Sequence, residues 1–172
     1  MDTSTALTFV LPDHVHDKIN EIRSTMDKAY PRWMPHINFI FPFVPPTEFS
    51  SVVEKLKDLD VKPFKITFSA IGYFSQGKNI TFHLKPDDES IKLLKQIFNK
   101  IKERLPDVSI KHTEFTPHAT LAQCSKNMLH ANLGMLETWL GGGIVVDCDK
   151  ICIIQRSPET SDRMVIKHAI NL

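Results

Sequence analysis

Two short motifs in the chain repeat the same order of residue types. Each places a proline before a histidine and a hydrogen-bonding residue two positions after it: His36 with Asn38, and His118 with Thr120. Each motif lies in an apolar stretch that predicts a β-strand, and on a strand residues i and i+2 point to the same face. We therefore expect two matching pairs of side chains, each pair projecting from one strand face.

Two such pairs facing across a groove suit the cleavage of a phosphodiester without a metal. Histidine gives or takes a proton near neutral pH, so His36 and His118 can divide the work of general base and general acid. Asn38 and Thr120 can donate hydrogen bonds to the non-bridging phosphate oxygens, where charge builds in the transition state. The nucleophile would be water for a 2',3'-cyclic phosphate and the neighbouring 3'-hydroxyl for a 2',5'-linked oligonucleotide. Which histidine is the base depends on the polarity of the bound substrate and stays open.

A single motif of this kind is weak evidence, because a histidine on a strand more often packs in a half-buried position. His130 and Asn132 have the same spacing, but they lie in a helical stretch, where residues i and i+2 do not share a face. The two retained motifs agree in their preceding proline, their strand context and the helix that follows each of them. That agreement favours a catalytic pair.

The elements that position these motifs alternate along the chain in a partly repeated order. Apolar alternation, helical periodicity and Pro or Gly breaks predict their bounds. Strands are expected over 6–11, 35–43, 64–74, 79–84, 118–123, 144–146, 151–155 and 164–170, and helices over 14–30, 47–59, 89–104 and 127–140. Asp13 is the expected N-cap of the first helix, and residues 76–78 the expected hairpin turn. The order predicts an α+β protein with two pseudo-symmetric lobes.

The sequence predicts the orientation of the first motif strand more clearly than that of the second. In the first strand, alternation sends Ile37, Phe39, Phe41 and Phe43 toward a core, and the histidine face toward a cleft. In the second strand, Gln123 breaks the apolar face, so its orientation is less clear.

Composition restricts the class of protein and its partners. The 172 residues are 42% hydrophobic with a net charge of +1, which favours a small nucleotide or an RNA end over a long duplex. The three cysteines have no zinc-site spacing, and no stretch reads as a secretory signal or a membrane span. We expect a cytoplasmic or nuclear monomer with reduced cysteines, no metal, no cofactor and no membrane partner.

The two motifs resemble those of the 2H phosphoesterase superfamily, which includes the LigT-like 2'-5' RNA ligases and cyclic phosphodiesterases. That family carries two motifs of the form His, any residue, Ser or Thr, then a hydrophobic residue. Residues 118–121 (HATL) match this pattern fully, whereas 36–39 (HINF) depart from it because Asn38 replaces the hydroxyl residue.

The resemblance covers nearly the whole chain and implies both a fold and an activity. It implies a single domain over residues 1–172 with two interleaved lobes, each an antiparallel sheet with helices outside, around a central groove. It also implies a metal-independent phosphodiesterase for 2',3'-cyclic or 2',5'-linked nucleotides or RNA ends. Two alternatives remain: a nucleotide-binding module that has lost turnover, and a partner protein that holds an RNA terminus for joining or processing.

Three further residues are candidates for binding the substrate. Tyr73 and Phe115 could stack on a base, and Arg156 could meet a phosphate with two parallel hydrogen bonds. The simpler interpretation is that the two aromatic residues pack in the core and that the arginine is solvated.

Overall fold

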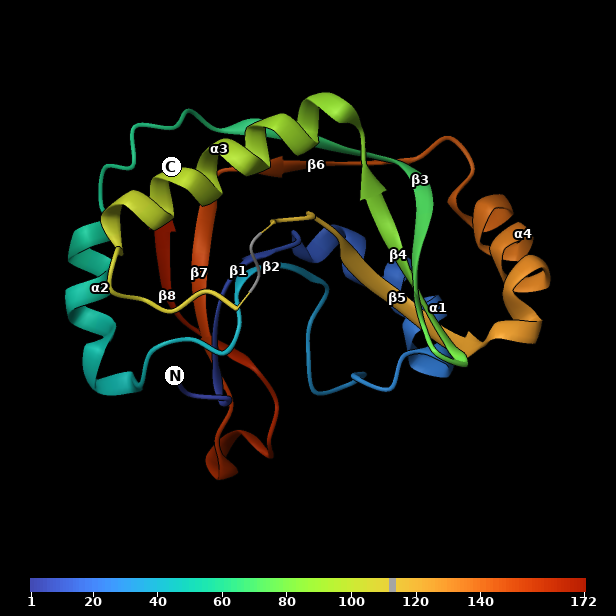
Figure 1. Ribbon diagram of the computed structural model, residues 1–172, viewed down its shortest axis with the longest axis horizontal. Helices are drawn as coiled ribbons and strands as arrows, with labels where there is room; N and C mark the ends of the chain where they lie inside the picture. The colour runs from blue at the N-terminus through green and yellow to red at the C-terminus, as the bar shows by residue number, and fades with distance from the viewer. Residues whose placement is uncertain (112–113) are drawn as a thin grey trace.

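The computed structural model describes residues 1–111 and 114–172, which form two four-stranded antiparallel sheets (Figure 1). The strand order is β2-β1-β7-β8 in the first sheet and β5-β4-β3-β6 in the second. The strands are β1 (Thr5–Val10), β2 (His36–Ile40), β3 (Phe64–Gln76), β4 (Asn79–Pro86), β5 (Ala119–Ser125), β6 (Ile144–Cys148), β7 (Lys150–Gln155) and β8 (Val165–Asn171). Each sheet with its helices is called a lobe below, and the predicted α+β fold with two lobes is confirmed.

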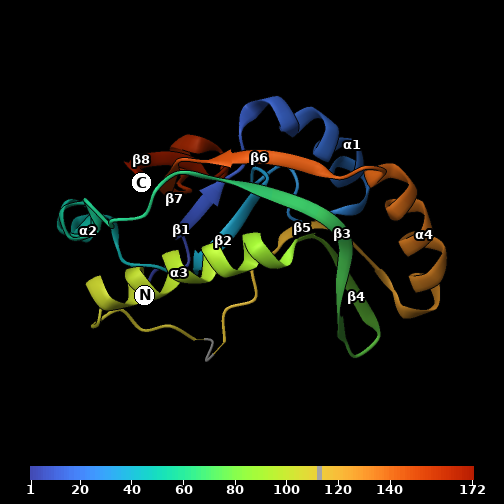
Figure 2. The ribbon, with the colours of Figure 1, turned by 90° about the horizontal axis from the view of Figure 1, so that it is seen from above.

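Four α-helices flank the sheets. They are α1 (His16–Met26), α2 (Phe49–Leu56), α3 (Asp88–Arg104) and α4 (Leu129–Leu140). Helix α2 contacts β8 at one end of the molecule and α4 contacts β3 at the other. Helix α1 packs against β5 of the other lobe, on the side of the molecule opposite the tip of the β3–β4 hairpin (Figure 2). Within residues 1–111 and 114–172, no helix has the length and apolar character needed to cross a membrane.

The lobes are interleaved in the chain. The first lobe takes β1 and β2 from the N-terminal part and β7 and β8 from the C-terminal part, whereas β3 to β6 are consecutive in the second. The two histidine motifs belong to β2 and β5, which are edge strands of their own sheets and contact each other. The fold therefore brings together two motifs that lie far apart in sequence.

The β3–β4 hairpin forms at the predicted turn. Gln76 pairs with Asn79, and Gly77 takes a positive φ of 60° in the two-residue loop, a conformation that glycine adopts without strain. From this turn the register continues down the hairpin and places Gly72 opposite His83.

Several predicted boundaries are wrong, among them the end of the second helix, which is Leu56 rather than residue 59, and two others lie close to the first motif. The first helix ends at Met26 rather than residue 30, because the Asp27 carboxylate accepts a hydrogen bond from the Ala29 N–H of the following loop and the backbone becomes extended at Asp27. The first motif strand ends at Ile40, since Pro42 lacks the N–H that would continue the ladder. As a result Phe41 is 37% exposed instead of lying in the core, while Phe43 is buried as expected.

The predicted N-cap at Asp13 is also wrong. Asp13 begins a 3-10 turn that precedes α1, and no side chain caps either the turn or the helix. By contrast, α3 begins with a true cap, because the Asp87 side chain accepts a hydrogen bond from the Ser90 N–H at 2.9 Å.

Candidate active site

The two motif pairs share a face as predicted. His36 and Asn38 are half-buried and are separated by a buried residue, and the same holds for His118 and Thr120. His118 lies one residue before β5, so its position is set by the segment that enters the strand. All four side chains therefore lie at the contact between the two lobes.

The two histidines make the same local hydrogen bond. Nδ1 of His36 lies 2.6 Å from the carbonyl oxygen of Met34, and Nδ1 of His118 lies 2.7 Å from that of Thr116. Because a carbonyl oxygen only accepts, Nδ1 carries the proton and donates in both cases. In the neutral ring, Nε2 is then the nitrogen that can accept a proton. The backbone therefore assigns the same atom, Nε2, to proton transfer in both histidines.

The surroundings of His36 favour its neutral form. Its ring stacks on Trp33, with centroids 4.8 Å apart and planes inclined by 23°. Burial is the main reason that the pKa of His36 falls from 6.5 to about 4, and the Met34 carbonyl only partly opposes this. The positive charges of Arg23 and His118 act in the same direction as burial. His36 is thus suited to begin a reaction as a proton acceptor.

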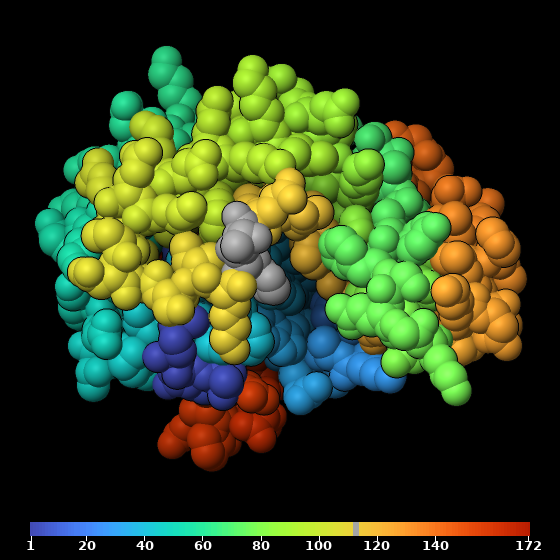
Figure 3. All heavy atoms as spheres, in the orientation of Figure 1, coloured from blue at the N-terminus to red at the C-terminus, as the bar shows by residue number. Residues whose placement is uncertain are grey.

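A cavity of about 430 Å³ lies against the second motif. It is lined by Asn38, Phe39, Phe41, Phe74, Gln76, Phe98, Ile110, Glu114, Phe115, Thr116 and His118, and is called the groove cavity below. Figure 3 shows this face hollowed at its centre, beside the β3–β4 hairpin. Of the four motif residues, Asn38 and His118 line it, and among its described lining residues Glu114 alone carries a formal charge at neutral pH.

The amide of Asn38 is incompletely bonded. Its Oδ1 is buried and has no hydrogen-bond partner among the described residues. An unsatisfied buried oxygen is costly, on the order of 1–3 kcal/mol. Since Asn38 also lines the groove cavity, a bound ligand that donates a hydrogen bond would remove this cost.

His118 is held among aromatic rings. Phe74 meets it edge to face with centroids 4.9 Å apart, and the ring of His83 lies 5.2 Å from it. His83 is 4% exposed and stacks on Phe74 at 4.7 Å. It fits because the residue opposite is glycine: a Cβ on Gly72 would come within 2.3 Å of the His83 ring.

A buried ion pair connects the two lobes behind the histidines. Arg23 Nε donates to the Asp27 carboxylate at 2.7 Å, and Arg23 also donates to the Trp33 carbonyl at 2.8 Å. The other Asp27 oxygen accepts from the Gln123 side chain of β5 at 3.1 Å, while the Gln123 oxygen accepts from the Lys28 N–H at 2.8 Å. Gln123, which interrupts the apolar pattern of its strand, thus joins the Trp33 loop to the strand after His118.

The three additional substrate-binding candidates lie in different places. Phe115 lines the groove cavity, although it also stacks on Phe98 at 4.5 Å. Tyr73 is 45% exposed and lines a neighbouring hollow instead. Arg156 follows β7, where its side chain donates to the Thr3 carbonyl, and it lines neither space. The structure therefore brings only Phe115 of the three into the groove cavity.

From the sequence alone, no role could be assigned to His83, and Arg23 and Asp27 were not identified as residues that support the site. The turn expected over residues 76–78 would have paired Gly72 with Phe82, and only the observed two-residue loop places His83 opposite Gly72. Arg23 and Asp27 have an i,i+4 spacing that usually marks an exposed helix pair, so the sequence gives no sign of their burial. His112, considered for a supporting role, lies outside the described residues.

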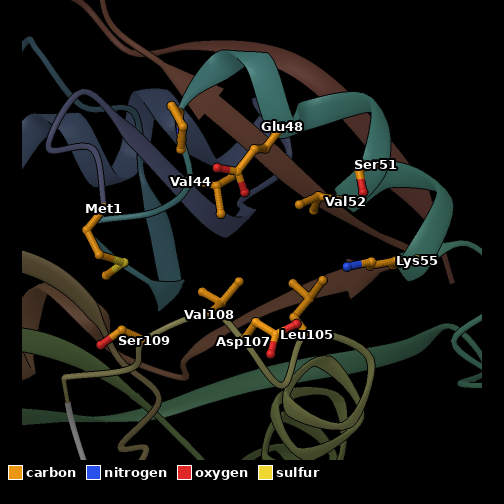
Figure 4. Close-up of a pocket in the computed structure, with 11 residues that line it drawn as sticks. Met1, Val44, Glu48, Ser51, Val52, Lys55, Leu105, Asp107, Val108 and Ser109 are labelled. Carbon is orange, nitrogen blue, oxygen red and sulfur yellow. The ribbon is translucent and has the colours of Figure 1, made fainter.

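A further hollow lies away from the histidines, between α2 and the segment after α3 (Figure 4). Glu48 and Lys55 come from one wall and Asp107 from the other, and no proposed catalytic residue lines it. Its mixed charges give no indication of a nucleotide site.

Comparisons with known proteins identify a family and a shared fold. A family model described as the 2'-5' RNA ligase superfamily matches residues 11–159. A structure of LigT from E. coli complexed with 3'-AMP has a TM-score of 0.63 and 12% identity, covering 99% of this chain and 98% of that one. Usb1 from Kluyveromyces marxianus has a TM-score of 0.54 and 8% identity, covering 99% of both chains. No curated protein sequence matches this chain.

Proposed function

Because the chain belongs to the 2'-5' RNA ligase superfamily, we propose that it is a 2H-type phosphodiesterase acting on 2',3'-cyclic or 2',5'-linked nucleotides or RNA ends. The observation that carries this proposal is the matched pair of histidines on contacting edge strands. In each, Nδ1 donates to the carbonyl two residues earlier, so that Nε2 is the nitrogen that takes up a proton in the neutral ring. The solved LigT structures include complexes with 3'-AMP and ATP, which supports a nucleotide as the ligand.

The mechanism assigns the two proton transfers to different histidines. His36, neutral because burial lowers its pKa to about 4, removes the proton from the attacking oxygen. His118 delivers a proton to the departing oxygen as the bond between phosphorus and that oxygen breaks. A cyclic phosphate thereby gives a nucleoside monophosphate, and a 2',5' linkage attacked by the 3'-hydroxyl gives a cyclic phosphate and a free 5'-hydroxyl.

Asn38 and Thr120 bind the phosphate in this proposal. Thr120 donates through its hydroxyl and Asn38 through its amide nitrogen, as charge grows on the non-bridging oxygens. The buried Oδ1 of Asn38 supports a second role, because it can accept a hydrogen bond from a ribose hydroxyl. The asparagine would then recognise a sugar and a phosphate through two separate atoms, whereas a threonine would have to contact both through one oxygen.

The test is cleavage of a substrate panel by EDTA-treated protein, with products separated by chromatography. The panel holds nucleoside 2',3'-cyclic phosphates, a 2',5'-linked oligoadenylate and a 3',5'-linked control. His36→Ala and His118→Ala should each abolish cleavage. His130→Ala is the matched control, since this exposed histidine has the same spacing to an asparagine but lies on α4. Wild-type rates in both motif variants would refute the catalytic assignment.

Asn38→Thr separates an enzyme from a binding module that has lost turnover. If Asn38 is functional, the substitution lowers kcat/KM because one hydroxyl replaces the separate donor and acceptor atoms of the amide. A large gain in rate would instead identify a lapsed enzyme, and nucleotide binding without cleavage of any panel member would identify the binding module.

A further inference from the structure

A second hollow lies beside His118, on the other side of the segment that precedes it. It has a volume of about 380 Å³, close to the 430 Å³ of the groove cavity. It is lined by Ala70, Ile71, Gly72, Tyr73, His83, Lys85, Ile91, Thr116 and Pro117, and is called the hairpin hollow below. Thr116 lines both spaces, so the two adjoin at the backbone that holds the His118 ring.

The hairpin hollow has the two features that bind a nucleotide. Tyr73, an aromatic lining residue, is 45% exposed, and Lys85 is an exposed cation. Aromatic rings stack on bases of any sequence, and a lysine neutralises a backbone phosphate as a point charge. The groove cavity, in contrast, has one charged wall residue among those described, the acidic Glu114.

His83 adds a buried polar group to the wall of this hollow. Its side chain is almost fully buried, with Nδ1 lying 3.3 Å from the Leu84 carbonyl. Nε2 makes no hydrogen bond in the described part of the chain. Gly72, which lines the same hollow, gives the ring its space. Because Nδ1 donates to a carbonyl, Nε2 of the neutral ring can accept a hydrogen bond from a ribose hydroxyl of an occupant.

On the other lobe, the residues that precede His36 pack against a hydrophobic cluster. There Trp33 and Met34 pack against the buried cluster formed by Ala6, Val10, Cys152, Ile154 and Met164. Trp33 also stacks on His36. A substrate centred on the two histidines can thus extend past His118 but meets packed side chains past His36.

We propose, resting on the proposed function, that the hairpin hollow binds the nucleotide on the leaving side of the scissile phosphate. The substrate class is then a linked oligonucleotide rather than a mononucleoside cyclic phosphate. The 3'-hydroxyl oxygen of the nucleotide in the groove cavity forms a bond to phosphorus, and its proton passes to His36. The bond from phosphorus to the 5'-oxygen breaks, and His118 protonates that oxygen. The products are a nucleoside cyclic phosphate and a nucleotide with a free 5'-hydroxyl.

The experiment measures kcat/KM for adenosine 2',3'-cyclic phosphate and for 2',5'-linked di- and triadenylate. Tyr73→Ala should lower kcat/KM for both linked substrates about 10-fold more than for the cyclic one, because only they place a base in the hairpin hollow. Lys85→Gln should weaken cleavage of the triadenylate but not of the diadenylate, which has no phosphate beyond the leaving nucleoside. Lys78→Gln at the hairpin turn, outside both spaces, is the charge-matched control and should change no rate.

The outcomes separate this inference from the proposed function. If His36→Ala and His118→Ala abolish cleavage but Tyr73→Ala affects cyclic and linked substrates equally, the inference is overturned and the proposed function stands. If both histidine variants keep wild-type rates, the proposed function fails. If the protein cleaves no substrate, triadenylate binding is measured directly, and equal affinity of wild type and Tyr73→Ala overturns the inference.

Discussion

The buried ion pair behind the histidines provides the sharpest test of the structure. Arg23 and Asp27 have side chains that are 2% and 0% exposed, and the Nε to carboxylate distance is 2.7 Å. Lys65 and Asp147 form a pair of almost the same length, 2.8 Å, but their side chains are 69% and 70% exposed. The two pairs therefore differ in burial and not in distance.

Burial determines the expected cost of breaking each pair. Asp27→Asn leaves the Arg23 guanidinium buried without a carboxylate, which should lower the free energy of unfolding by about 3–5 kcal/mol. Asp147→Asn breaks a solvent-screened pair and should cost about 0–1 kcal/mol. Removing both buried charges, in Arg23→Met with Asp27→Leu, should cost less than Asp27→Asn alone because no charge is then left unpaired.

Urea unfolding of the variants measures these costs, and tryptophan fluorescence gives a local readout. In a Trp139→Phe background Trp33 is the remaining tryptophan, and Arg23 holds its backbone carbonyl at 2.8 Å. Asp27→Asn should shift the Trp33 emission before global unfolding, whereas Asp147→Asn should not. If Asp27→Asn costs no more than Asp147→Asn, or if the double variant is the least stable, the account of this ion pair is refuted.

Three further outcomes are expected. Gly72→Ala should destabilise the fold by about 1–3 kcal/mol and reduce activity, because the new Cβ would meet the His83 ring at 2.3 Å; equal stability in urea would contradict this packing. Gly134→Ala on α4, where a Cβ meets nothing within 4 Å, should instead stabilise by about 0.5–1 kcal/mol in the same assay. Lowering the pH from 6.5 to about 4 should reduce the free energy of unfolding. Burial lowers the pKa of both His36 and His83 to about 4, so between these pH values the unfolded chain binds more protons than the folded one. Denaturation at a series of pH values checks the sign, and a rise in stability toward pH 4 would exclude neutral buried rings.

Local patterns in the sequence predicted most of the secondary structure and both motif faces. Alternation identified β2 and β5, and the half-burial of His36 and His118 confirms that each histidine shares a face with its polar partner. The hairpin turn was predicted because Gly77 supplies a positive φ that few other residues adopt. These features depend on residues close in the chain, which is why the sequence alone reveals them.

Pairing between distant segments could not be predicted from these local patterns. The sequence did not reveal that β6 joins the sheet of β3 while β7 and β8 join that of β1, or that Gln123 of one lobe bonds Asp27 of the other. Tyr73 was expected at the same site as Phe115, but the fold places it in the adjoining hollow.

The candidates for the chemistry of this protein therefore came from its sequence, and the arrangement of those candidates from its tertiary structure. Residue types and a two-residue spacing sufficed to select His36, Asn38, His118 and Thr120, because strand geometry alone gives each pair a common face. Which groups surround them depended on long-range packing. Burial lowers the pKa of His36, and the glycine across the hairpin leaves space for the His83 ring beside His118. Neither effect can be predicted from the neighbouring residues in the sequence.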